Sequence, residues 1–85
     1  MSSETEIDGR RATQLAQQYF VEQYGLYGVL VFEVESAEYN QDDKSWTITC
    51  SFFRTFMTPQ KSYYSVVIYS DGRIGPVRKI EQQSR

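Results

Sequence analysis

The spacing of apolar residues changes once along this chain, and that change restricts the fold more than any other feature of the sequence. Between Ala12 and Tyr24 the apolar residues recur every three or four positions, as in an amphipathic helix. From Val29 to Tyr69 they recur mostly at every second position, as in strands. The sequence therefore predicts one helix followed by a sheet.

The predicted helix spans residues 8–24. Asp8 (or Thr5) is the expected N-cap, because its side-chain oxygen can accept a hydrogen bond from the first turn. Gly25 is expected to end the helix, since glycine adopts a positive φ without a Cβ penalty. One side of this helix should pack on the sheet, and its apolar stripe consists of Ala12, Leu15, Ala16, Tyr19, Phe20 and Tyr24.

Four segments after the helix are predicted strands, and short turns separate them. Residues 40–44 and 58–60 are rich in turn formers. Asp71-Gly72 predicts a two-residue hairpin with a type I′ turn, which needs positive φ at both positions. Pro76 cannot donate a ladder hydrogen bond, so the last strand should lie at an edge. The predicted strands are residues 29–39, 46–57, 61–70 and 74–80.

Short connections favour antiparallel neighbours, and one helix across one face completes a two-layer domain. We therefore expect an α+β fold with one N-terminal helix packed on a three- to four-stranded antiparallel sheet. Residues 1–85 should form a single domain, with residues 1–7 and 81–85 disordered. The side chains expected to face the helix are Leu30, Phe32, Val34, Trp46, Ile48, Cys50, Phe52, Tyr64, Val66 and Ile68.

The other face of such a sheet has no helix to cover it. The alternation places Val29 and Val31 there, together with an aromatic and apolar group that often marks an interaction site. This group fits a homodimer, or a protein or peptide bound on the face or at a strand edge. Tyrosine and threonine also occupy half-exposed strand positions without any role. The candidate partner-binding residues are Phe53, Met57, Tyr63, Val67 and Tyr69.

The sequence offers little for catalysis. It contains no histidine, the commonest general base and metal ligand, and one cysteine, Cys50, which is expected to fill the core. Glu33 and Glu35 share a strand face, where a carboxylate pair can serve as acid and base or hold a hard cation, or simply meet solvent. We expect no enzyme activity and no cofactor. The predicted function is a small non-enzymatic interaction or regulatory module.

Binding of single-stranded nucleic acid is the alternative function. Aromatic side chains on an uncovered sheet face can stack on bases, and Phe53, Tyr63 and Tyr69 would do so with Arg54, Lys61 and Arg73 nearby. The alternation, however, predicts that Arg54 points to the opposite face from Phe53. The net charge of −2 and the lack of a recognised RNA-binding motif argue against it.

The charges are unevenly distributed along the chain. Residues 1–43 hold two basic and nine acidic side chains, a balance of −7, whereas residues 44–85 hold seven basic and two acidic ones, a balance of +5. Pairing of charges across strands within one sheet explains this asymmetry. The alternative explanation is one basic surface, or head-to-tail self-association.

The same sequence predicts a protein that neither enters nor crosses a membrane. No apolar run approaches the ~20 residues that a spanning helix needs, and the first residues lack the apolar core of a secretory signal. A single cysteine cannot form an internal disulfide, which favours a reducing compartment. We expect a soluble cytoplasmic protein.

Several short motifs resemble those of the small PepSY-like and cystatin-like domains. The helix is followed by Trp46-Thr47-Ile48, then by Tyr64-Ser65-Val66-Val67-Ile68 and Asp71-Gly72-Arg73-Ile74, over most of residues 10–75. The resemblance implies a helix cradled by an antiparallel sheet and a binding or inhibitory role rather than catalysis. Such domains are often exported, whereas this chain shows no export signal, which argues against inhibition of a peptidase.

Overall fold

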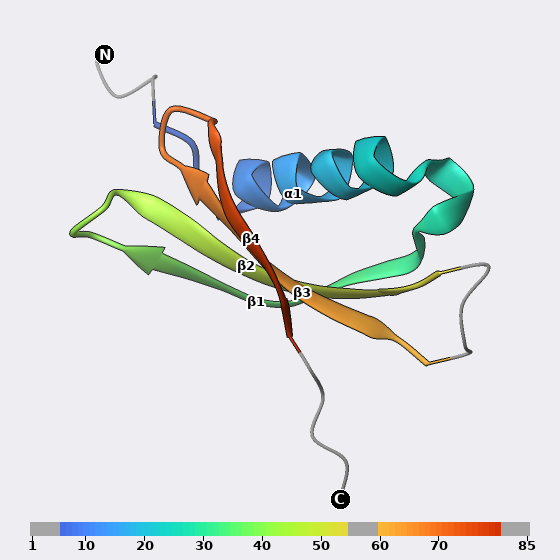
Figure 1. Cartoon of the computed structure of the whole chain (residues 1–85). Helices are drawn as coiled ribbons and strands as arrows, with labels where there is room; N and C mark the ends of the chain where they lie inside the picture. Colours follow the sequence, from blue (N-terminus) through green and yellow to red (C-terminus); the bar gives the residue numbers. More distant parts are fainter. Residues whose placement is uncertain (1–5, 55–59, 81–85) are drawn as a thin grey trace, which may run out of the picture.

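The predicted helix is present as α1 (Gly9–Tyr24) in the computed structural model, which describes residues 6–54 and 60–80. Asp8 caps its first turn, because the carboxylate Oδ1 accepts a hydrogen bond from the backbone N–H of Arg11 at 2.9 Å. Gly25 ends the helix with a φ of 83°. A short 3₁₀ turn, η2 (Leu26–Gly28), then leads the chain into the sheet (Figure 1).

The strands form a simple meander, in which neighbours in the sequence are also neighbours in the sheet. All three pairings are antiparallel, and the order is β1-β2-β3-β4. Helix α1 lies across one face of this sheet (Figure 1). The α+β prediction is confirmed, with four strands among the described residues: β1 (Leu30–Asn40), β2 (Ser45–Phe53), β3 (Ser62–Tyr69) and β4 (Ile74–Ile80).

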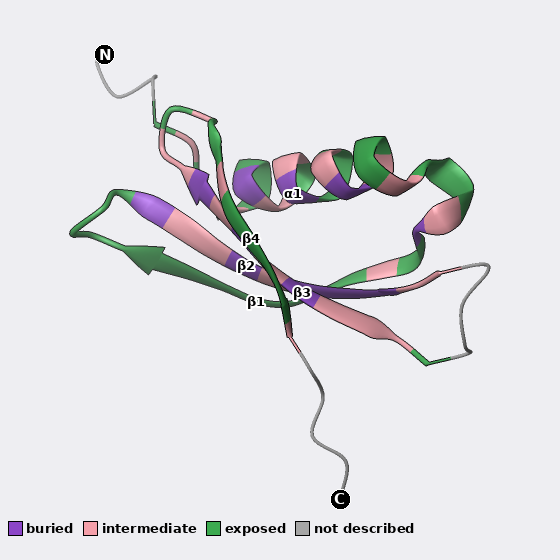
Figure 2. Cartoon of the chain, viewed as in Figure 1, coloured by how far each residue is buried: buried purple, intermediate pink, exposed green. Residues whose placement is uncertain are grey.

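The core lies between α1 and the two central strands (Figure 2). Phe20 is its centre, with ring centroids 5.2 Å from Tyr64 and 5.4 Å from Phe52. Tyr64 and Phe52 stack on each other at an angle of 2°. Most side chains predicted to face the helix from β2 and β3 are therefore buried. The buried hydrophobic residues are Ala12, Ala16, Phe20, Val29, Ile48, Cys50, Phe52, Tyr64, Val66 and Ile68.

Strand β1 departs from the predicted alternation because it contains two bulges. Its register with β2 shifts once between Leu30 and Glu33 and again between Val34 and Ser36, and each shift leaves one extra residue in β1. Val31, inside the first bulge, has a φ of 56°, which is unfavourable for a β-branched residue.

These bulges change which side chains of β1 reach the core. The prediction that Leu30 faces the helix is wrong, because Leu30 pairs with Phe53 on the opposite face. The prediction that Val29 lies on the uncovered face is also wrong, because Val29 joins the core just before the strand begins. Phe32 packs against the core as predicted, whereas Val34, opposite Cys50, remains exposed.

The connection between β3 and β4 differs from the predicted type I′ turn. Only Gly72 has a positive φ, of 93°, whereas type I′ also needs one at Asp71. The N–H of Gly72 donates to the carbonyl of Tyr69 at 2.8 Å, and the N–H of Tyr69 donates to the carbonyl of Arg73 at 2.9 Å. This is a three-residue loop in which a glycine follows the turn as a bulge.

The segment before α1 is attached to the sheet through Trp46. The indole Nε1–H of Trp46 donates to the carbonyl of Ile7 at 3.3 Å, and the N–H of Ile7 donates to the carbonyl of Ser70 at 3.1 Å. A Cβ atom on Gly9 would lie 3.1 Å from the indole ring. Trp46, predicted to be in the core, is thus half-buried at its edge, where it holds the start of the helix against β2 and β3.

Candidate functional site

The candidate site is the face of the sheet opposite α1, which we call the open face. In the described part of the chain, the helix covers the other face over β1, β2 and β3. Strand pairing and side-chain contacts determine which residues lie on the open face. The open face is formed by Leu30, Glu33, Glu35, Ser36, Glu38, Asn40, Ser45, Thr47, Thr49, Ser51, Phe53, Tyr63, Ser65, Val67, Tyr69, Gly75, Arg78 and Ile80.

Two of the predicted partner-binding residues lie at one end of the open face. Phe53 pairs with Leu30, and Tyr63 pairs with Ile80. The two pairs lie in adjacent rows, ~7 Å apart along the strands, because Tyr63 pairs with Ser51 rather than with Phe53. The sequence prediction missed Leu30, because of the bulges, and Ile80, because Pro76 obscures the alternation of the last strand. Met57, predicted as part of this group, lies outside the described residues.

Two more predicted residues, Val67 and Tyr69, lie at the opposite end. Gly75 makes room for both, because a Cβ atom there would lie 2.8 Å from the Cε2 of Tyr69 and 3.1 Å from the Cβ of Val67. The Tyr69 ring therefore lies along the sheet over β4, and the Arg73 guanidinium carbon is 4.8 Å from its centroid. The result is a second, flatter apolar area.

A polar row separates these two apolar areas. Thr49 pairs with Ser65, and Ser65 pairs with Arg78, so small hydroxyl side chains and one guanidinium occupy the middle of the face. Tyr63 and Val67 are four residues apart on one strand, or ~13 Å. The described partner-binding residues therefore share one face but form two areas rather than one continuous patch.

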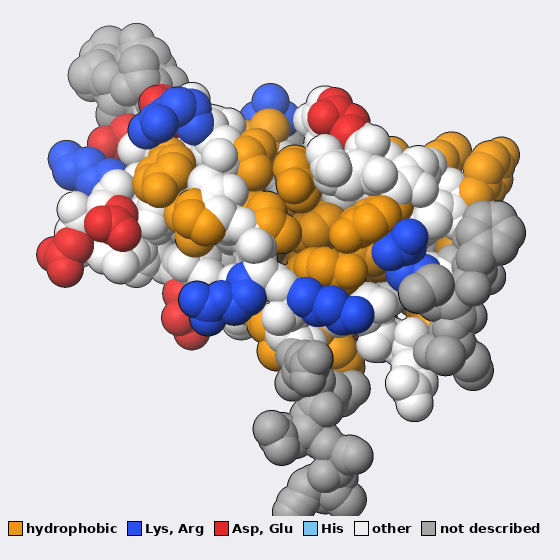
Figure 3. All heavy atoms as spheres, viewed as in Figure 1, with side chains coloured by type: hydrophobic (Ala, Val, Ile, Leu, Met, Phe, Trp, Pro, Cys, Tyr) orange, Lys and Arg blue, Asp and Glu red, His pale blue; other side chains and the backbone are white. Residues whose placement is uncertain are grey.

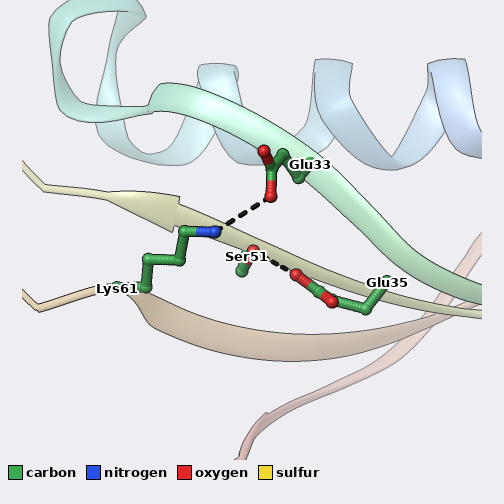
Figure 4. Close-up of polar contacts among 4 residues, drawn as sticks. All are labelled: Glu33, Glu35, Ser51 and Lys61. Atoms are coloured by element: carbon green, nitrogen blue, oxygen red, sulfur yellow. Dashed lines mark hydrogen bonds and ion pairs between the residues drawn. The ribbon is translucent and has the colours of Figure 1, made fainter.

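A small polar network lies between β1, β2 and the start of β3 (Figure 4). The Lys61 Nζ donates to Glu33 Oε1 at 2.9 Å, and the Ser51 hydroxyl donates to Glu35 Oε2 at 2.7 Å. The hydrogen bond to Glu33 raises the pKa of Lys61. Ser51 is 0% exposed although it faces away from the helix. The two glutamates thus hold cross-strand contacts, and each has a structural partner.

The edges of the open face carry opposite charges. Strand β1 contributes Glu33, Glu35 and Glu38, and Glu38 pairs with Thr47, which fixes it on this face. Strand β4 contributes Arg78, paired with Ser65. The open face therefore has three glutamates at its β1 edge and one arginine at its β4 edge.

The single cysteine is placed where it cannot act as a nucleophile. Cys50 is fully buried beneath α1, and its Sγ lies 3.8 Å from the carbonyl oxygen of Tyr64. Burial, and then the charge of Glu35, raise the pKa of this thiol to about 12. The thiol is therefore protonated and inaccessible at neutral pH. Among residues 6–54 and 60–80, no group of three or more acidic or cysteine side chains is arranged to hold a metal ion.

A second exposed apolar surface lies on the helix side, and the sequence prediction did not identify it. Ile74 and Val77 of β4 point to that side but remain 39% and 36% exposed. A cavity of about 190 Å³ opens here, lined by residues that include Leu15 and Tyr19 of α1. Figure 3 shows hydrophobic side chains gathered between the helix and β4. The sequence did not predict this surface, because Pro76 interrupts the alternation of apolar and polar residues in the last strand.

No described helix has both the length and the apolar character needed to span a bilayer. Comparisons with protein-family models, curated proteins and solved structures return no match.

Proposed function

We propose that this protein is a non-enzymatic interaction module that binds a protein surface, another copy of itself included, through the open face of its sheet. One observation carries the proposal: a four-stranded sheet has a helix on one face only, and its other face presents Phe53, Tyr63, Val67 and Tyr69 half-buried. Apolar and aromatic side chains that remain partly accessible on one surface are typical of association sites.

The arrangement of polar groups also supports binding rather than catalysis. Glu33 and Glu35 are engaged with Lys61 and Ser51, so the acidic pair is used to shape the face. The resemblance to PepSY-like and cystatin-like domains implies a binding role and agrees with this proposal. We place the protein in the cytoplasm, where the thiol of Cys50 would stay reduced.

Binding of single-stranded nucleic acid is supported less well. Lys61 lies 6.0 Å from the Phe53 ring and Arg73 lies over Tyr69, but each cation also has a carboxylate partner, at 2.9 Å and 2.8 Å. The acidic edge of β1 lies on the same face and would repel phosphates. Arg54 is on the helix side, 3.9 Å from the Tyr24 ring centroid.

The test compares two valine-to-glutamate variants on opposite faces. Val67→Glu introduces a charge on the open face, and Val77→Glu introduces the same charge on the helix side of the neighbouring strand. Light scattering coupled to size exclusion, from low micromolar to near-millimolar protein, should show wild-type self-association that Val67→Glu weakens and Val77→Glu preserves. Far-UV circular dichroism verifies that both variants are folded.

The opposite result would reject the open face as the site. Association abolished by Val77→Glu and not by Val67→Glu would assign binding to the surface between α1 and β4. Salt-sensitive retention of the wild type on single-stranded DNA, lost in Arg73→Glu, would favour the alternative function.

A further inference from the structure

We propose that the open face binds a second copy of this chain face to face, about a two-fold axis that runs along the strands. In this dimer the acidic β1 edge of each copy lies over the basic β4 edge of the other. The inference rests on the proposed function, and it adds the partner and its orientation.

The charge pattern of the face disfavours the other simple orientation. A two-fold axis across the strands would place β1 over β1 and β4 over β4, so Glu38 would approach Glu38 and Arg78 would approach Arg78. An axis along the strands exchanges the two edges and places Glu38 opposite Arg78 twice, once for each copy. Like charges in an interface cost several kcal/mol, so the second arrangement is favoured.

The strand register brings these charges to nearly the same level. Arg78 lies in the row of Ser65 and Thr49, and Glu38 lies in the adjacent row with Thr47. Adjacent rows on one face are ~7 Å apart along the strands, and an axis along the strands preserves that level. An arginine side chain spans this offset. Among residues 6–54 and 60–80, neither Arg78 nor Glu38 is in an ion pair, so both charges are available.

The shape of the face suits a second sheet. Its middle rows on β2 and β3 include small polar side chains, Thr47, Thr49 and Ser65, which allow two sheets to approach to ~10 Å. Four strands of about eight residues give a face of ~500 Å². A pair would therefore bury ~1,000 Å², at the lower limit for a specific interface. A dimer that forms in the micromolar range is expected.

Pairing of the sheets through their edges is less favourable. Joining β1 to β1 would align acidic strands, and joining β4 to β4 would align Arg78 and Lys79 with their equivalents. Pro76 further removes one backbone donor from β4. Pairing β1 with β4 satisfies the charges but leaves free edges at both ends, so it would produce open-ended growth instead of a dimer.

The test uses complementary charge reversals measured by sedimentation equilibrium. Arg78→Glu alone and Glu38→Arg alone each create two like-charge contacts in the proposed dimer, and each should weaken it by about tenfold or more. An equimolar mixture of the two variants restores both opposite-charge contacts, so the heterodimer should form with an affinity close to that of the wild type. Lys79→Glu is the matched control, because Lys79 pairs with buried Tyr64 and faces the helix side.

Each outcome decides one point. The two-fold axis along the strands would be supported by three results together. Each single variant weakens the dimer, the mixture restores it, and Lys79→Glu leaves it unchanged. A wild-type dimer that Val67→Glu disrupts but that the mixture fails to restore would overturn this axis and leave the proposed function intact. A wild type that stays monomeric at every concentration would overturn both the dimer and self-association. The proposed function would then be limited to the binding of another protein.

Discussion

Phe20 offers the most direct test of how the helix is held on the sheet. Its ring is 1% exposed and lies within 6.5 Å of the ring centroids of Tyr24, Phe32, Phe52 and Tyr64. Truncation to alanine removes most of a buried side chain and leaves a cavity between α1 and β2. The transfer and cavity contributions together lower the free energy of unfolding by ~3–5 kcal/mol.

This loss is large relative to the total stability of the domain. A chain of 85 residues has a free energy of unfolding of roughly 4–13 kcal/mol. Phe20→Ala would therefore shift the urea midpoint by about 2 M or more, or unfold the protein without denaturant. Phe20→Leu keeps most of the apolar volume, so this variant should stay folded and lose only about 1–1.5 kcal/mol of its free energy of unfolding.

The assay is urea unfolding followed by far-UV circular dichroism at low micromolar concentration. Phe53→Ala is the matched control, since Phe53 lies half-buried on the open face and should lose about 1 kcal/mol. A loss below 1 kcal/mol for Phe20→Ala, or a greater loss for Phe53→Ala, would refute the placement of the core between α1 and the sheet.

Three further perturbations test separate features. Because burial raises the pKa of the Cys50 thiol from an ordinary value of 9.0 to about 12, the unfolded chain loses this proton first above pH 9. Above pH 9 the free energy of unfolding of the wild type should therefore fall by ~1.4 kcal/mol per pH unit more than that of Cys50→Ala. Equal pH slopes of the two proteins in urea titrations would contradict this. Val31→Asn should raise the melting temperature, because residue 31 has a φ of 56° and is 62% exposed, and asparagine adopts a positive φ with less strain than a β-branched residue; a lower melting temperature would contradict that strain. Gly75→Ala should lower the free energy of unfolding by ~1–3 kcal/mol, because its Cβ would meet the Tyr69 ring and the Val67 backbone, and an unchanged thermal transition would show that the ring moves freely.

The predictable parts of the fold are those where one periodicity continues without interruption. The helix and its caps at Asp8 and Gly25 follow from spacing and from the preferences of single residues. In β2 and β3 the alternation is unbroken, and the side chains predicted to face the helix are buried there, except for half-buried Trp46. The structure of these elements follows from the residue preferences and the spacing within each segment, and the tertiary contacts agree with them.

Strand β1 could not be predicted in the same way, because a bulge has no reliable local signal. Each extra residue reverses the alternation beyond it, so the first bulge puts Leu30 on the open face although Val34, four residues later, lies on the helix side. The charges of the candidate site show a related limit. The uneven distribution of acidic and basic residues was visible in the sequence, but its arrangement across one face depends on β1 and β4 being the two edges.

The meander order of the strands also has a consequence for the internal motions of the domain. Strands β2 and β3 are paired on both sides, whereas β1 and β4 each have a neighbour on one side only. Amide protons of β2 and β3 should therefore exchange with solvent most slowly, at rates set by global unfolding, while many in β1 and β4 exchange through local opening. Because the open face extends across all four strands, binding there would slow exchange most at the two edges.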